Sequence, residues 1–370
     1  MAEQITLHAS GDYAELDAYF RANRAKKIFL VCGRSIQSMR INGYFQKLES
    51  GTDIQVVRFS GFQPNPSYES VVEGVELFRG EKCDCIAAVG GGSTMDVAKC
   101  VKLFANMDGT QNYLRQEIVP NGIQLLAVPT TAGTGSEATR YAVIYFEGEK
   151  QSISDESCIP SAVLMDPSLL RTLPDRHRTA AMLDALCHGI ESFWSVNSTE
   201  ESRAYSRAGI QGVLANMESY LSNEDSGSAG MLAAANIAGK AIDLTQTTAG
   251  HAMCYHLTSL YGVAHGHAAA LCVSKLWPYM AAHTEKCVDP RGEEYLREIF
   301  GEIARAMGCE TVQEAVETFQ SIVRRTGIKL PPRGDYALLS RSVNPVRLKN
   351  NPVALSVEDA GEIYRQIFEE

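Results

Sequence analysis

The stretch Cys85-Ile-Ala-Ala-Val-Gly-Gly-Gly-Ser-Thr-Met-Asp-Val-Ala-Lys99 leads from an apolar run through three glycines into a helix-forming segment. Glycines lack side chains, so a phosphate can approach the backbone there. The free amides and the dipole of the following helix favour the phosphate's negative charge. Ser93 and Asp96 also fit a capping box at the start of that helix. Because the pattern is not G-x-G-x-x-G, a tight turn with an ordinary cap is the alternative interpretation.

The rest of the first half alternates short apolar runs with helix-length amphipathic stretches. Buried strands are predicted at residues 27–32, 53–58, 85–89, 124–128 and 161–165. Helices are predicted between them, for example at residues 68–79 and 94–106. Strands that alternate with helices imply a parallel sheet covered on both faces. We therefore expect a Rossmann-like α/β domain that binds a dinucleotide.

A second polar turn follows the fourth of these strands, in Val128-Pro-Thr-Thr-Ala-Gly-Thr-Gly-Ser-Glu137. Its hydroxyl groups and glycines supply several hydrogen-bond donors directly after a buried strand. Ligands of doubly wound sheets bind along this carboxyl edge. Two such turns in one domain strengthen the prediction of a nucleotide site.

The pattern changes near residue 174. Apolar residues then recur three and four apart, as in Leu183, Leu186, Ile190 and Phe193, which predicts a helix. Further helices are predicted at residues 231–242, 268–280 and 295–307, with a polar loop at residues 222–228. No strand is expected in this half. The expected organisation is an α/β domain over residues 1–174 and an all-helical domain over residues 175–370.

Composition limits the classes of protein that the chain can belong to. Of its 370 residues, 45% are hydrophobic and 21% are charged, which is typical of a globular protein. The net charge of -10 argues against a nucleic-acid partner, and no apolar run approaches the roughly 20 residues that cross a membrane. The N-terminus lacks a secretory pattern, and the ten cysteines are scattered without a paired framework. We expect reduced thiols and a cytoplasmic protein.

A carboxylate and several histidines suggest a metal site. Asp184 and His188 lie four apart on a predicted helix, so both project from one face. Burial of such a pair needs compensation, which a divalent cation provides. A later cluster holds His251, His265 and two further histidines, and one carboxylate with three imidazoles suits iron(II) or zinc. The alternative is a set of helix histidines that bind nothing.

At this point the sequence resembles the iron-containing (group III) alcohol dehydrogenase family. The resemblance is carried by Pro64-Asn-Pro66, Gly90-Gly-Gly-Ser93 with Asp96, Pro129-Thr-Thr-Ala-Gly-Thr-Gly-Ser-Glu137, Asp184-Ala-Leu-Cys-His188-Gly-Ile-Glu191, and His251 with His265-Gly266. It implies an N-terminal NAD(P)-binding α/β domain, a helical C-terminal metal-binding domain and a homodimer or larger homo-oligomer. It also implies that Asp184, His188, His251 and His265 are the ligands of iron(II) or zinc.

The cofactor preference is predicted from residues 33–35. NAD-preferring relatives tend to place an acidic residue after the first strand, where it holds the ribose 2′-hydroxyl. This chain has an arginine and a serine there, which suit the 2′-phosphate of NADP(H). The alternative is that the arginine is a solvated surface charge. The cofactor-binding candidates are Gly33, Arg34, Ser35, Asn65, Gly90, Gly91, Gly92, Ser93, Asp96, Thr130, Thr131, Thr134 and Lys150.

The proton relay departs from the family pattern. Family members often carry a histidine four residues after the third ligand, where this chain has Tyr255 with His256 beside it. Tyr255 or His256 is therefore the candidate that moves the proton, and a packing or substrate-contact role is the alternative for both.

The segment from Gln246 to His267 looks like the phosphonoacetaldehyde reductase branch of the family. That branch implies reduction of phosphonoacetaldehyde to 2-hydroxyethylphosphonate. A dianionic substrate needs cationic groups, for which the candidates are Arg140, Lys240, His256 and Lys275. The alternatives are a broad short-chain alcohol dehydrogenase, a non-redox lyase resembling dehydroquinate synthase, and a binding protein without catalysis.

Overall fold

The computed structural model describes residues 4–9, 11–328, 330, 334–343 and 348–369. Contacts divide the chain into two compact units. The first holds Met1–Thr131 and Gly135–Leu173, and the second holds Pro174–Glu370 together with the short segment Ala132–Thr134. Within the described residues, no helix is long and apolar enough to cross a membrane.

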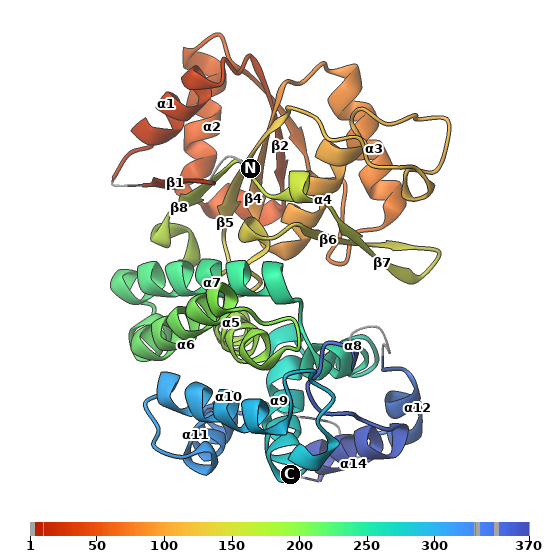
Figure 1. Cartoon of the computed structure of the whole chain (residues 1–370). Coiled ribbons are helices and arrows are strands. Elements are labelled where there is room, and N and C mark those ends of the chain that lie inside the picture. Colours follow the sequence, from red (N-terminus) through yellow and green to blue (C-terminus); the bar gives the residue numbers. More distant parts are fainter. Residues whose placement is uncertain (1–3, 10, 329, 331–333, 344–347, 370) are drawn as a thin grey trace. The chain divides into compact units, whose positions relative to one another are not determined.

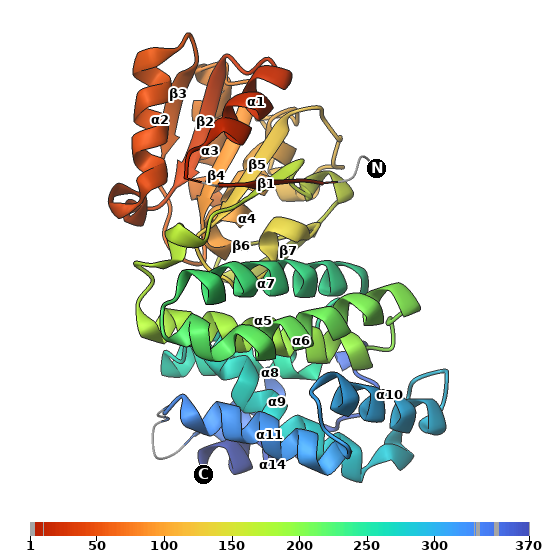
Figure 2. The same cartoon turned by 90° about the vertical axis from the view of Figure 1, so that its left-hand side faces the viewer.

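The first unit is built on a parallel sheet of six strands. In spatial order these are β1 (Ile5–His8), β8 (Ala162–Met165), β5 (Gln124–Pro129), β4 (Cys85–Gly90), β2 (Lys27–Cys32) and β3 (Gln55–Phe59). Figures 1 and 2 show one pair of helices on each face of this sheet. These are α1 (Ala14–Ala22) with α2 (Arg40–Gly51), and α3 (Tyr68–Gly80) with α4 (Gly92–Phe104). The predicted α/β architecture is thus confirmed.

The centre of the sheet is fully apolar, because helices cover it on both sides. Every residue of β4 is buried, and Phe29, Ile86 and Val101 belong to one core cluster with neighbouring strands and helices. All five predicted strands are present. The sequence did not predict β1, of which only Leu7 is buried, nor the hairpin of β6 (Tyr141–Phe146) and β7 (Glu149–Ser154).

The second unit is helical. Its described helices are α5 (Asp175–Trp194), α6 (Glu200–Leu221), α7 (Asp225–Thr245), α8 (Ala249–Tyr261), α9 (His265–Ala282), α10 (Glu293–Ala306), α11 (Val312–Arg325), α12 (Tyr336–Arg341) and α14 (Val357–Phe368). Among its described residues the only strand-like pairing is a bridge between Cys287 and Val353. The apolar stripe predicted on α5 is buried along its whole length.

Two local predictions were wrong. The polar segment at residues 222–228 is not a loop throughout, because α7 already begins at Asp225. Ser93 and Asp96 do not form a capping box, since the residue that caps α4 is Gly91 and no side chain caps the helix. The carbonyl oxygen of Gly91 instead accepts from the N–H of Thr94 at 3.1 Å and from that of Met95 at 3.2 Å. The prediction of reduced thiols fits the structure, in which all ten cysteines are free.

Candidate metal centre

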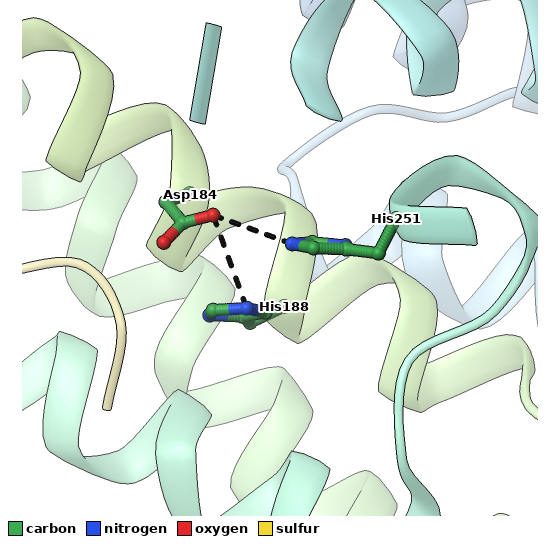
Figure 3. Close-up of side chains that lie close together, drawn as sticks. All are labelled: Asp184, His188 and His251. Atoms are coloured by element: carbon green, nitrogen blue, oxygen red, sulfur yellow. Dashed lines mark hydrogen bonds and ion pairs between the residues drawn. The ribbon is translucent and has the colours of Figure 1, made fainter. Parts of the chain in front are cut away.

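Three imidazole side chains of the second unit converge on one carboxylate oxygen of Asp184. Oδ1 of Asp184 lies 3.3 Å from Nε2 of His251, 3.8 Å from Nε2 of His265 and 3.9 Å from Nε2 of His188. Figure 3 shows Asp184 and His188 projecting from α5 towards His251 of α8. Asp184, His188 and His251 are buried, whereas the His265 side chain is 39% exposed. The structure thus brings together all four predicted ligands.

Close packing of α9 on α5 makes this convergence possible. Gly266 follows His265, and a Cβ atom at Gly266 would lie 1.9 Å from the carbonyl oxygen of Ala180 and 2.8 Å from Cβ of Asp184. Only glycine fits at this distance, so Gly266 lets the start of α9 lie directly against the helix that carries Asp184.

The other nitrogen of each imidazole faces a protein group. Nδ1 of His188 lies 3.2 Å from the carbonyl oxygen of Gly133, and Nδ1 of His251 bonds to Oε2 of Glu191. Nδ1 of His265 lies 3.6 Å from Sγ of Cys254. A carbonyl and a carboxylate only accept hydrogen bonds, so His188 and His251 must carry hydrogen on Nδ1. Their Nε2 atoms then present lone pairs to Asp184 unless they bind a second proton.

The electrostatics favour a cation at this point. Burial alone would raise the pKa of Asp184, but His188, His265 and His251 lower it well below its usual range. Burial lowers the pKa of His188 despite the opposing effect of Asp184, so this ring is neutral. Burial would also lower the pKa of His251, yet Glu191 and Asp184 raise it to about 9. Surroundings that hold a proton on His251 also favour a metal ion that replaces it.

The spacing of the ligand atoms fits a small divalent ion. Ligand atoms held tetrahedrally at about 2.1 Å from an ion lie about 3.4 Å from one another. The distances of 3.3, 3.8 and 3.9 Å from Asp184 to the three imidazoles are close to this value. Three imidazoles with one carboxylate suit iron(II) and zinc alike.

The two candidates for the proton relay, Tyr255 and His256, lie on α8, four and five residues after His251. The ring of Tyr255 stacks on His265, with 5.7 Å between the ring centroids and 29° between their planes. His256 is half-buried. Cys254 is buried, and its thiol contacts His265.

The nucleotide candidates lie in the first unit, apart from Thr134. A pocket of about 360 Å³ lies at the ends of β2, β3 and β4 and brings Gly33 and Arg34 together with Ser93. Ser35, the next residue, is exposed. The backbone N–H of Asn65, a residue with a φ of +58°, donates a hydrogen bond to Oγ of Ser93 at 3.3 Å.

The glycine turn is packed too tightly for larger residues. A Cβ atom at Gly90 would lie 2.1 Å from Oγ1 of Thr94, and one at Gly91 would lie 3.3 Å from Oγ1 of Thr131. The N–H of Thr130 donates to the carbonyl oxygen of Gly90 at 3.0 Å, which joins the two polar turns. Gly92 is the first residue of α4.

Asp96 faces inward from α4. Burial raises its pKa to about 7, although Lys99 and, more weakly, Lys150 and Ser136 oppose the shift. The ammonium group of the buried Lys99 donates to Oγ of Ser136 at 3.1 Å and to the carbonyl oxygen of Tyr141 at 2.7 Å. Lys99 thereby ties the second polar turn to α4, a role that the sequence did not suggest.

The candidates for binding an anionic substrate belong to different elements of the two units. Arg140, in the first unit, forms an ion pair with Glu156 at 3.3 Å. Lys240 lies half-buried on α7 and Lys275 half-buried on α9. Lys275 follows His265 by ten residues, which is about 15 Å along a helix.

Sequence reasoning gave no role to two groups that contact the imidazoles. These are the carboxylate of Glu191 and the carbonyl of Gly133. Glu191 follows Asp184 by seven residues and His188 by three, so helical spacing already places the three on one face. A backbone carbonyl leaves no such signal.

The fold and the candidate site are those expected of a nucleotide-linked oxidoreductase with a metal centre. The family model for iron-containing alcohol dehydrogenase matches residues 4–167. The model for the C-terminal part of the Fe-containing alcohol dehydrogenase family matches residues 178–334. The chain therefore belongs to the iron-containing alcohol dehydrogenase family.

Individual relatives agree with this assignment. A phosphonoacetaldehyde reductase of Streptomyces viridochromogenes is 32% identical over 80% of this chain and 79% of that protein. Alcohol dehydrogenase 4 of Saccharomyces cerevisiae is 27% identical over 99% of this chain and 97% of the yeast protein. Among solved structures, the sulfoacetaldehyde reductase of Bifidobacterium kashiwanohense, in complex with NAD+, has a sequence 25% identical to this chain. The two structures match with a TM-score of 0.86 over 99% of this chain and 97% of that chain.

Proposed function

We propose that this chain reduces phosphonoacetaldehyde to 2-hydroxyethylphosphonate, using NADPH in preference to NADH and a divalent ion, iron(II) or zinc. The observation that carries the metal requirement is the convergence of three imidazole Nε2 atoms on Oδ1 of Asp184. The substrate is supported by two relatives whose names describe reductases of acetaldehydes that carry a phosphonate or a sulfonate.

The residues at the centre have distinct tasks. Asp184, His188, His251 and His265 would hold the ion, which supplies Lewis acidity towards the aldehyde oxygen when bound. Reduction consumes one hydride from the nicotinamide and one proton, so that aldehyde, NADPH and H⁺ give alcohol and NADP⁺. Tyr255 or His256 is proposed to deliver the proton. The stacking of Tyr255 on His265 favours a position beside the reacting oxygen for Tyr255.

The cofactor preference is proposed from Arg34. Its side chain lines the pocket that also contains Gly33 and Ser93, and the sequence there lacks the carboxylate that would hold a ribose 2′-hydroxyl. A guanidinium group pairs well with a phosphate, because two parallel N–H bonds reach two oxygens. Arg140, Lys240 and His256 remain the candidates for the substrate's phosphonate, and the position of Lys275 along α9 makes it the weakest of the set.

The test follows absorbance at 340 nm under anaerobic conditions with iron-loaded protein. NADPH and NADH are each offered with phosphonoacetaldehyde and with acetaldehyde as the matched uncharged substrate. We expect the highest kcat/KM with NADPH and phosphonoacetaldehyde, and no activity in Asp184→Asn. Equal or better activity with acetaldehyde would refute the proposed substrate but would still support an aldehyde reductase.

A second candidate is a broad short-chain alcohol dehydrogenase. It is favoured by the match to yeast alcohol dehydrogenase 4, which extends over 99% of this chain. Oxidation of ethanol and propanol at rates similar to 2-hydroxyethylphosphonate would support this candidate. Turnover of a sugar phosphate without net use of NAD(P)H would instead support a non-redox lyase.

A further inference from the structure

Glu191 forms four hydrogen bonds next to the candidate metal centre. It lies on α5 with no exposed surface. Its Oε1 accepts from the N–H of Thr248 at 3.1 Å, the hydroxyl of Thr248 at 2.6 Å and the N–H of His251 at 3.2 Å. Its Oε2 accepts from Nδ1 of His251. Thr248, the residue directly before α8, makes no capping bond of its own.

Glu191 therefore caps a helix to which it does not belong. The amides of Thr248 and His251 are among those that no carbonyl within α8 can satisfy, and a negative charge is favourable at this end of a helix. Trp194, one turn after Glu191 on α5, donates from Nε1 to the hydroxyl of Thr248 at 2.8 Å. Gly250 leaves room for the carboxylate, since a Cβ atom there would lie 3.0 Å from Oε1 of Glu191.

We propose that Glu191 is a positioning residue that fixes the tautomer of His251 and aims its Nε2 atom at the metal ion. The proposal rests on the metal centre of the proposed function. Three donors meet Oε1 of Glu191, namely the N–H and hydroxyl of Thr248 and the N–H of His251, and an ionised carboxylate satisfies all of them. An ionised carboxylate only accepts hydrogen bonds, so the hydrogen of a neutral His251 stays on Nδ1 and Nε2 keeps its lone pair. Carboxylates that orient metal-bound histidines in this way also raise the basicity of the ligand.

Replacement by glutamine separates this role from simple packing. A glutamine has nearly the same shape, and its oxygen would remain with the three donors that now meet Oε1. Its NH₂ group would then face Nδ1–H of His251, which places two donors against each other. The ring can relieve this contact by moving its hydrogen to Nε2, the atom that faces Asp184 at 3.3 Å. Glu191→Gln should therefore weaken metal binding while α8 keeps its anchor.

Thr248→Ala is the matched control. It removes the hydroxyl that bridges Trp194 and Glu191 but leaves the bond between Glu191 and His251. We expect this variant to melt at a lower temperature than the wild type and to bind metal with an affinity within about threefold of it. A purely structural role for Glu191 would make both variants behave alike.

The experiment measures Zn(II) affinity by competition with a chromophoric chelator, and thermal unfolding of the metal-free proteins by circular dichroism. We expect Glu191→Gln to bind Zn(II) about 10–100-fold more weakly than the wild type. Wild-type affinity in Glu191→Gln, or an equal loss in Thr248→Ala, would overturn the proposal. Asp184→Asn distinguishes a failure of this proposal from a failure of the proposed function, because retained Zn(II) in that variant would refute the metal centre itself.

A measurement on the unaltered protein keeps the proposal testable if Glu191→Gln does not fold. In the Zn(II)-loaded wild type, nitrogen NMR of ¹⁵N-histidine should show a hydrogen on Nδ1 of His251 and zinc on Nε2. Zinc on Nδ1, or a Nδ1 without hydrogen, would overturn the assignment of Glu191.

Discussion

Replacement of Gly266 by alanine should move His265 away from the other candidate metal ligands. A Cβ atom at this position would lie 1.9 Å from the carbonyl oxygen of Ala180 and 2.8 Å from Cβ of Asp184. Both neighbours belong to α5, and neither the carbonyl nor the Cβ atom can rotate away. Either α9 must withdraw from α5 or both helices must distort.

The size of the displacement follows from ordinary contact distances. A carbon atom and a carbonyl oxygen approach to about 3.3 Å, so α9 must withdraw by about 1.4 Å at this point. His265 precedes Gly266, and its Nε2 now lies 3.8 Å from Oδ1 of Asp184. A shift of this size would leave His265 too far from the other ligands to share an ion with them. Overpacking of this kind costs about 1–3 kcal/mol.

The assay combines thermal unfolding with metal analysis. With an unfolding entropy of about 2.1 cal/mol/K per residue, each kcal/mol lowers Tm of this 370-residue chain by about 1–1.5 °C. The matched control is Gly301→Ala on α10, where the nearest atom to an added Cβ is the flexible end of Arg305 at 3.4 Å. That control should be unchanged or more stable by up to about 1 kcal/mol. If Gly266→Ala melts like Gly301→Ala and binds metal like the wild type, the close approach of α5 and α9 does not position His265.

Three further predictions concern the first unit. Arg34→Ala should raise KM for NADPH by about 10–100-fold, because one or two charge-assisted hydrogen bonds to the 2′-phosphate are lost. KM for NADH should stay within about twofold of the wild-type value. Equal effects on both KM values would refute NADP(H) recognition by Arg34. Gly90→Ala should weaken binding of both nucleotides, because its Cβ would lie 2.1 Å from Oγ1 of Thr94, and a wild-type dissociation constant by fluorescence titration would contradict this. Burial raises the pKa of Asp96 from 3.8 to about 7, so the folded protein binds the extra proton and stability falls as pH rises between those values. Asp96→Asn should remove this fall in thermal unfolding at pH 5 and pH 8, and an unchanged pH dependence would exclude Asp96 as its source.

The fold was predictable where burial was complete. The strands β2, β4 and β5 are continuous apolar runs, and β4 has no exposed residue, so their sequences admit one interpretation. The edge strand β1 has four residues of which only Leu7 is buried, and β7 is largely polar. Such segments form strands because a neighbour offers backbone partners, and composition does not encode that pairing.

The four candidate ligands of the metal centre could be predicted from the sequence, but the groups that contact their imidazole rings could not. Spacing placed Asp184 and His188 on one helical face, and the family resemblance selected His251 and His265. The contact of His188 with the carbonyl of Gly133 joins residues that are 55 positions apart and uses only backbone on one side. Tertiary packing creates contacts of this kind, so they appear only in the structure. For Glu191, helical spacing predicts that it shares a face with Asp184 and His188, but nothing in the sequence predicts its hydrogen bond to His251.

The most direct test of the metal centre is a crystal structure of iron-loaded protein with anomalous data on both sides of the iron absorption edge. We predict one strong iron peak per chain, bounded by Oδ1 of Asp184 or its second oxygen and by Nε2 of His188, His251 and His265. The peak should be absent from Asp184→Asn crystals grown with the same iron. Iron at another position, or iron bound through the sulfur of Cys254, would contradict the assignment.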